Sequence, residues 1–107
     1  MEKTIKEIVW TKPAKNDLQE IYDYLAEFAE EAAFRVIMRI IDKTEVLKDG
    51  FTEIGQRELL LTHKTDVYRY LVESNYKIIY RVKGDRIIID TVFDARRNPD
   101  KLPDKVK

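Results

Sequence analysis

The chain has 107 residues, a length that suits one domain over 1–107, and 44% of them are hydrophobic against 37% charged, enough for one core. It has no cysteine and a single histidine, His63, which excludes a disulfide framework and a thiolate or histidine-rich metal site. No apolar run approaches the ~18 residues of a membrane span, and residues 1–7 lack a signal-peptide core, so we expect a cytoplasmic protein without membrane contact or cofactor.

The net charge of zero conceals an asymmetry between the two parts of the chain. Residues 1–55 carry 8 Lys/Arg and 12 Asp/Glu, a net charge of −4, whereas residues 56–107 carry 12 and 8, a net charge of +4. Scatter over a solvated surface is one interpretation. The other is a C-terminal half that meets an acidic partner, either nucleic acid or protein.

The first half of the chain predicts one strand followed by two helices. Residues 5–10 are rich in β-branched side chains, as strands are. Thr11 and Pro13 mark one helix start, since proline is tolerated in the first turn, and Glu30 with Glu31 marks the next at the positive end of the helix dipole. The very short link predicts an antiparallel hairpin. Its expected apolar stripes are Ala14, Leu18, Ile21, Tyr22, Leu25 and Phe28, then Ala33, Val36, Ile37, Ile40, Ile41, Thr44 and Leu47.

The second half of the chain predicts four strands, because after Gly55 apolar residues recur with a period of about 2. The strands are expected at 57–63, 67–73, 76–83 and 86–94, with two-residue turns at 74–75 and 84–85. Residues 98–107, with two prolines and many charges, are expected to be loosely ordered. The predicted fold is α+β in the order β-α-α-β-β-β-β: an N-terminal strand, a helical hairpin, and a four-stranded antiparallel meander with the hairpin on one face.

The two tight turns predict the register of the last three strands, and the register assigns each side chain to a face. Leu71 is expected opposite Ile78, Tyr80 opposite Ile89, and Ile78 opposite Thr91. One face, expected under the helices, is almost wholly apolar and holds Leu71, Tyr76, Ile78, Tyr80, Val82, Ile87, Ile89 and Phe93. The other, which we call the outer face, is expected to be free and holds Tyr68, Tyr70, Val72, Lys77, Ile79, Arg81, Ile88, Asp90 and Val92, with Arg96 at its margin.

The outer face combines cations with tyrosines and aliphatic residues, which makes it the candidate binding site. Asp90 is expected diagonal to Lys77 and Arg81. One interpretation is that Asp90 only neutralises these two cations, as cross-strand pairs commonly do; the other is that an apolar surface with embedded cations binds a partner. A protein would use the aromatic residues and the arginine, whereas RNA would stack on Tyr68 or Tyr70 and bring its phosphates to the cations.

Three segments of the predicted sheet, 67–72, 75–82 and 92–99, together with the helical pattern at 14–25, resemble the ParE branch of the RelE/ParE toxin superfamily. The resemblance covers about residues 5–100. It implies the toxin of a two-gene toxin–antitoxin module, a cytoplasmic protein held inactive by a small antitoxin, often in a 2:2 complex. In such modules the C-terminal segment of the antitoxin wraps the toxin.

The two branches of this superfamily differ in what they attack. The ParE branch poisons DNA gyrase and has no recognised catalytic residues, whereas the RelE branch cleaves mRNA on the ribosome. RNA cleavage needs a base, a cation for the dianionic phosphorane and an acid for the leaving oxygen. Lys77, Arg81 and Arg96 match the cationic part. However, Leu102 stands where the nucleases carry a tyrosine, and Asp94 stands where ParE-like chains often carry a histidine.

We therefore expect a toxin that binds a protein target such as gyrase. A RelE-type endoribonuclease and a decayed toxin that only binds its antitoxin are the alternatives. Two residues remain as general-base candidates. His63 is expected to be exposed at a strand end without a catalytic role, and two neighbouring cations are expected to depress the pKa of Asp90, which makes it a poor base.

Overall fold

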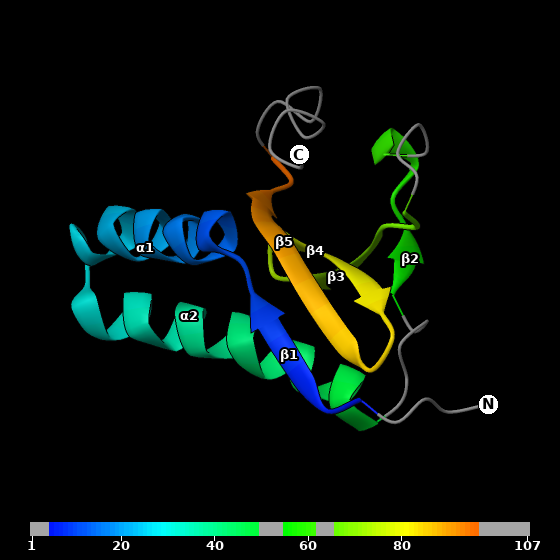
Figure 1. Ribbon diagram of the computed structural model, residues 1–107. Helices are drawn as coiled ribbons and strands as arrows, with labels where there is room; N and C mark the ends of the chain where they lie inside the picture. Colours follow the sequence, from blue (N-terminus) through cyan, green and yellow to red (C-terminus); the bar gives the residue numbers. More distant parts are fainter. Residues whose placement is uncertain (1–4, 50–54, 62–65, 97–107) are drawn as a thin grey trace.

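The computed structural model describes residues 5–49, 55–61 and 66–96, which form one five-stranded sheet covered on one face by two helices (Figure 1). The elements in chain order are β1 (Glu7–Trp10), α1 (Lys12–Ala26), α2 (Glu30–Thr44), the 3₁₀ helix η1 (Glu45–Asp49), β2 (Gln56–Arg57), the 3₁₀ helix η2 (Leu59–Leu61), β3 (Arg69–Glu73), β4 (Tyr76–Lys83) and β5 (Arg86–Asp94). The strand order is β1-β5-β4-β3-β2, with β1 parallel to β5 and the other pairs antiparallel. The predicted α+β fold is confirmed.

Both helices begin where the sequence predicts. Thr11 is the N-cap of α1, because its hydroxyl accepts a hydrogen bond from the Ala14 N–H at 3.3 Å. α2 begins at Glu30, with acids in its first turn. Phe28 lies beyond the end of α1 and is 75% exposed, so its predicted place in the buried stripe is wrong. The reason is that this end of the hairpin extends past the sheet, and no strand lies beneath it (Figure 1).

The main core lies between the helical hairpin and the sheet. Ala14 of α1 and Ile40 of α2 meet strand residues that, apart from Val92, the alternation assigns to the helix side. Each large apolar side chain buried here contributes roughly 1.5–3 kcal/mol. The buried strand residues of this core are Leu71, Tyr76, Ile78, Tyr80, Ile87, Ile89 and Val92.

A β-bulge in β5 interrupts the predicted register. Tyr80 pairs with Ile89 as predicted, but Ile79 pairs with Thr91, so Asp90 is an extra residue on β5. A bulge of this kind bends the strand and increases its twist. It also reverses the alternation of side chains for every residue that follows, because the side-chain period of a strand is two.

The bulge overturns the predictions for the last part of β5. Ile78 pairs with Val92, not with Thr91 as predicted, although its pairing with Leu71 on the other side is confirmed. Val92 packs in the core under the helices, and Phe93 packs on the outer face, the reverse of their predicted places. Counting from the turn at 84–85 was therefore valid only as far as the bulge.

The outer face is partly covered by the chain itself. The strand predicted at 57–63 is wrong in its described part, because β2 ends at Arg57 and η2 follows. η2 brings Leu61 onto the sheet, so the outer face is not free as predicted. A second buried cluster forms there from Leu61, Tyr68, Ile79 and Phe93, and Tyr70 packs against it.

Some predictions fall outside the described residues. These are the predictions for His63, Leu102, the tail at 98–107 and the end of the strand expected at 57–63. Within the described ranges, no helix is long and apolar enough to cross a membrane.

Candidate functional site

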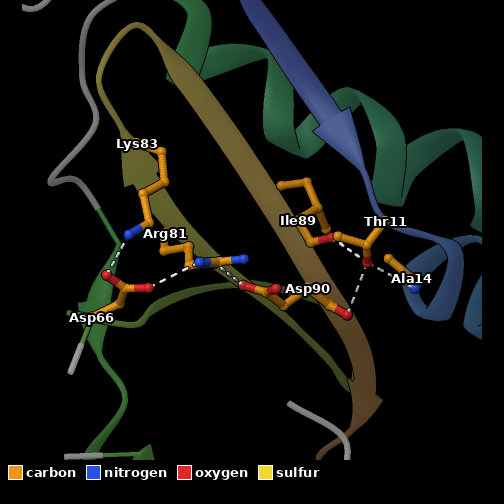
Figure 2. A network of polar contacts seen from close by, with 7 residues as sticks. All are labelled: Thr11, Ala14, Asp66, Arg81, Lys83, Ile89 and Asp90. Atoms are coloured by element: carbon orange, nitrogen blue, oxygen red, sulfur yellow. Dashed lines mark hydrogen bonds and ion pairs between the residues drawn. The ribbon is translucent and has the colours of Figure 1, made fainter. Parts of the chain in front are cut away.

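Four charged side chains form a network on the outer face beside the bulge (Figure 2). The Nε of Arg81 donates to Oδ2 of Asp90 at 3.0 Å, and its Nη1 donates to Oδ2 of Asp66 at 2.8 Å. Lys83 donates from Nζ to Oδ1 of Asp66 at 2.7 Å. Two cations and two carboxylates thus balance each other, and the guanidinium lies between the carboxylates (Figure 2).

The bulge directs Asp90 toward Arg81. The Thr11 hydroxyl donates to the carbonyl of Ile89 at 2.8 Å and to that of Asp90 at 3.2 Å, so the start of α1 holds the backbone of the bulge (Figure 2). The side chain of the bulged residue then reaches the outer face, as bulges near functional sites often re-aim a side chain.

Asp17 of α1 holds the next two residues of β5 from the helix side. Its buried carboxylate accepts a hydrogen bond from the Val92 N–H at 3.0 Å and another from the Thr91 hydroxyl. A buried carboxylate is stabilised when such donors replace the water it has lost. The first turns of α1 therefore hold the bulge on both sides of Asp90.

The two carboxylates beside Arg81 differ in their acidity. Burial raises the pKa of Asp90 above its usual 3.8, and the neighbouring Arg81 only partly offsets this. The prediction that two cations depress this pKa is wrong, because Lys77 binds another carboxylate and burial outweighs the charge of Arg81. A hydrogen bond from Lys83 lowers the pKa of Asp66.

Lys77 has its own carboxylate partner. Its Nζ lies 3.0 Å from Oε2 of Glu58, a side chain that is 3% exposed, and 4.2 Å from the centroid of the Tyr70 ring. The Tyr70 hydroxyl donates to Oε1 of Gln56 at 3.0 Å. Glu58 therefore balances the charge of Lys77, and the interpretation in which Asp90 neutralises both cations holds for Arg81 alone.

Arg96 lies apart from this network. Its guanidinium donates to Asp94 at 3.2 and 3.1 Å, and its side chain is 63% exposed. The Asp94 carboxylate raises the pKa of Arg96, and weaker contributions come from Tyr76 and Tyr24. Tyr76 belongs to the core under the helices. The bulge thus moves the end of β5 toward the helix side, so Arg96 does not lie at the margin of the outer face as predicted.

The sequence reasoning missed Asp66 and Lys83 of the network and also Glu58, which binds Lys77 beside it. Asp66 lies two residues before Tyr68 and four before Tyr70, so in an extended chain all three face the same side. Alternation continued backward from β3 would therefore have placed Asp66 on the outer face. Glu58 had no such signal, because only η2 brings it over the sheet. Of the predicted site residues, the structure brings together Tyr68, Arg81 and Asp90, places Lys77 against Tyr70, and leaves Arg96 apart.

A groove of about 500 Å³ separates α2 from the edge of the sheet. β2 pairs with β3 only at Arg69 and Tyr70, so residues 71–73 have no neighbouring strand on that side among the described residues. Val72 is 49% exposed there. The groove is lined by Asp42, Lys43, Val46, Gly55, Gln56, Tyr70, Leu71 and Val72.

Comparisons with known proteins agree with this architecture. The model of the family described as the ParE toxin of the type II toxin–antitoxin system, parDE, matches residues 8–99. The chain belongs to the ParE toxin family. A solved structure described as the chromosomal ParDE toxin–antitoxin system from P. aeruginosa is similar in fold, with a TM-score of 0.68 and 23% identity over 85% of this chain and 96% of that chain. A search of the curated proteins found no match.

Membership of the ParE family gives the described surfaces a context. A toxin of a type II toxin–antitoxin system has an antitoxin partner, which the family description itself implies. In this ParE-family toxin, the outer-face network around Arg81 and the groove beside Val72 are the two candidate surfaces for its partners.

Proposed function

We propose that this ParE-family toxin inhibits growth by binding a protein target, with DNA gyrase as the candidate, and that a cognate antitoxin neutralises it in the cytoplasm. The observation that carries the proposal is the charge balance of the outer face. Arg81, Lys77 and Lys83 each have a carboxylate partner within 3.0 Å. Such a surface suits recognition by a protein better than cleavage of RNA.

The charge balance argues against a RelE-type reaction for a simple electrostatic reason. A cation that stabilises a phosphorane must meet negative charge as that charge develops. Arg81 lies between two carboxylates, which would repel a phosphate at short range, and Lys77 pairs with a buried one. A protein partner can instead contact the network through its outer hydrogen-bonding groups and the tyrosines beside it.

The groove between α2 and β3 is the antitoxin contact that we propose. An acidic, amphipathic segment of the antitoxin would pair with the backbone of residues 71–73 and place an apolar side chain against Val72. Lys43 on the wall of the groove offers a cation for one of its acidic side chains. Main-chain pairing gives such a contact affinity, and the side chains give it specificity.

Expression of the chain alone in a bacterium tests the function. We expect growth arrest, induction of the DNA-damage response and linear DNA trapped on gyrase, all relieved when the antitoxin is co-expressed. Rapid loss of mRNA with intact DNA would favour the ribonuclease instead. Absence of growth arrest would favour a decayed toxin that only binds its antitoxin.

A matched pair of variants tests the antitoxin contact. Val72 and Val67 are 49% and 48% exposed, but only Val72 lines the groove. Val72→Glu is expected to abolish co-purification with the antitoxin because it places a charge against an apolar, acidic segment, while growth arrest persists. Val67→Glu is the control and should co-purify normally. Equal behaviour of the two variants would exclude the groove as the antitoxin site.

A further inference from the structure

One half of the helical hairpin projects beyond the sheet, with the α1–α2 turn at its far end (Figure 1). The residues that anchor the helices lie at the opposite end, where Ala14 and Asp17 of α1 and Ile40 and Thr44 of α2 are buried. Of residues 18–39, all of them described, Ala33 alone is buried. We call residues 20–38 the projecting end.

The projecting end exposes large apolar side chains. Tyr24 is 55% exposed, Phe28 75%, Phe34 59% and Met38 39%. The rings of Tyr24 and Phe28 pack edge to face with their centroids 5.7 Å apart, so part of this surface is already ordered. Exposed apolar groups gathered on one end of a small protein commonly mark an interaction site.

The projecting end is also acidic. All of its carboxylates are exposed, and none forms an ion pair with another described residue. Over residues 20–34 there is no Lys or Arg to offset them, and Arg35 is the one cation of the projecting end, which leaves a net charge of −4 over residues 20–38. The acids of this stretch are Glu20, Asp23, Glu27, Glu30 and Glu31.

We propose that the projecting end docks a basic protein segment in which Lys or Arg side chains flank one or two apolar side chains. The apolar groups of the partner would cover the aromatic rings, and its cations would meet the surrounding carboxylates. This surface is separate from the outer-face network and the groove, and the inference does not depend on which target the toxin has.

Charge also decides against other occupants. A two-fold contact between the projecting ends of two copies would bring two identical sets of carboxylates together, because an isologous interface pairs a patch with itself. Nucleic acid and anionic lipid would be repelled in the same way. A basic protein segment is the occupant that the charge and the exposed rings both favour.

A synthetic peptide provides a direct test on the full chain. The probe is a helical peptide of about 15 residues, roughly 22 Å long, with Leu along one face and Lys elsewhere, and its counterpart carries Glu in place of Lys. Binding is measured by calorimetry and mapped by amide chemical shifts of the labelled protein. We expect the Lys peptide to shift amides of residues 20–38, and the Glu peptide not to bind.

Two sets of variants locate the contact by different chemistry. Phe28→Ser with Phe34→Ser removes apolar area, and Glu27→Lys with Glu31→Lys reverses charge. Each pair is expected to weaken binding roughly tenfold or more, as truncation of a central contact does. The controls are Val67→Ser and Asp49→Lys, at exposed positions outside the projecting end. They should change the affinity for the Lys peptide by less than about twofold, because residues outside a binding surface contribute little to binding. Circular dichroism confirms that the variants keep their helices.

Several results would overturn the inference. Equal binding of the Glu peptide would show that charge is not used, and shifts confined to the outer face would place the contact elsewhere. Unchanged affinity in both variant pairs would exclude these residues. A dimer detected by sedimentation velocity and dissociated by the Phe28 and Phe34 substitutions would assign the surface to a second copy of the chain.

Discussion

At Arg81, two carboxylates reach one guanidinium from different parts of the chain. Asp90 comes from the bulge in β5, and Asp66 from the segment before β3. Burial raises the pKa of Asp90, whereas a hydrogen bond from Lys83 lowers that of Asp66. Because a pKa that differs between the folded and unfolded states links stability to pH, these two residues act in opposite directions.

Substitution of each carboxylate should therefore alter the pH dependence of stability with opposite sign. Folded Asp90 holds its proton more tightly than the unfolded chain does. Its contribution to the stability of the fold is therefore fully present below pH 3.8 and is lost as the pH rises through the folded pKa. The contribution of Asp66 to stability is fully present above pH 3.8 and is lost as the pH falls through its folded pKa.

Urea unfolding from about pH 3 to 6 provides the measurement. The free energy of unfolding of the wild type minus that of Asp90→Asn should decrease as the pH rises. The same difference for Asp66→Asn should increase. Slopes of the same sign would contradict the assignment of the two environments.

If Arg96 serves function and not folding, Arg96→Ala should abolish growth arrest and leave the fold almost unchanged. Its side chain is 63% exposed and pairs with Asp94, and exposed ion pairs contribute little to stability. The melting temperature should fall by no more than a few degrees. Lys48→Ala, which removes a similar exposed pair with Glu45, is the control and should leave growth arrest intact. A large loss of stability would make Arg96 a structural clamp.

At the scale of elements, the bulge in β5 and the start of α1 determine each other. Without the bulge, Phe93 would face the helices and Val92 would face outward, as simple alternation predicts. Thr11 and Asp17 favour the bulged arrangement instead, because their side chains bind the backbone on both sides of Asp90. A helix thereby controls which face of the sheet each residue at the end of β5 occupies.

Asp17→Ala tests this coupling. It leaves the Thr91 hydroxyl and the Val92 N–H without the acceptor they share, so we expect a loss of about 2 kcal/mol in the free energy of unfolding. Asn16→Ala, an exposed neighbour on the same helix, should cost less than about 0.5 kcal/mol. Thr91→Val combined with Asp17→Ala should cost less than the sum of the two changes. If the two losses were strictly additive, the hydrogen bond between Asp17 and Thr91 would not be the source of the lost stability.

At the scale of the whole molecule, the core is displaced toward one end. The described chain extends 43 × 29 × 21 Å, and the sheet supports only the part of the hairpin nearest β1 (Figure 1). β4 and β5 are buried under the helices, whereas the projecting end has little apolar area beneath it. Local stability should follow this distribution of buried contacts.

Hydrogen exchange measures this distribution amide by amide. The amides of β4 and β5 should be the most protected, and those of residues 22–34 should exchange faster than the rest of the hairpin, since few buried contacts oppose their opening. The turn at 74–75 serves as an exposed reference. Uniform protection along both helices would contradict this picture.

Local sequence patterns were enough to predict the order of the elements, both helix starts and the pairing next to the two turns. These features depend on residues close together in the chain. The Thr11 cap is one example, and the turns at 74–75 and 84–85 are another, where Ser74 and Gly84 adopt positive φ angles of 57° and 62°. Candidate residues that lie before the bulge, such as Arg81, were placed on the correct face for the same reason.

The surroundings of those candidates depend on contacts between residues far apart in the sequence. The bulge is held by a residue 74 positions away in sequence, a contact that no local pattern encodes. It moved Phe93 to the outer face and directed Asp90 at Arg81. The cover provided by η2 likewise brought Glu58 to Lys77. Long-range hydrogen bonds and buried charges therefore turned a face predicted to be open and basic into one that is partly covered and charge-balanced.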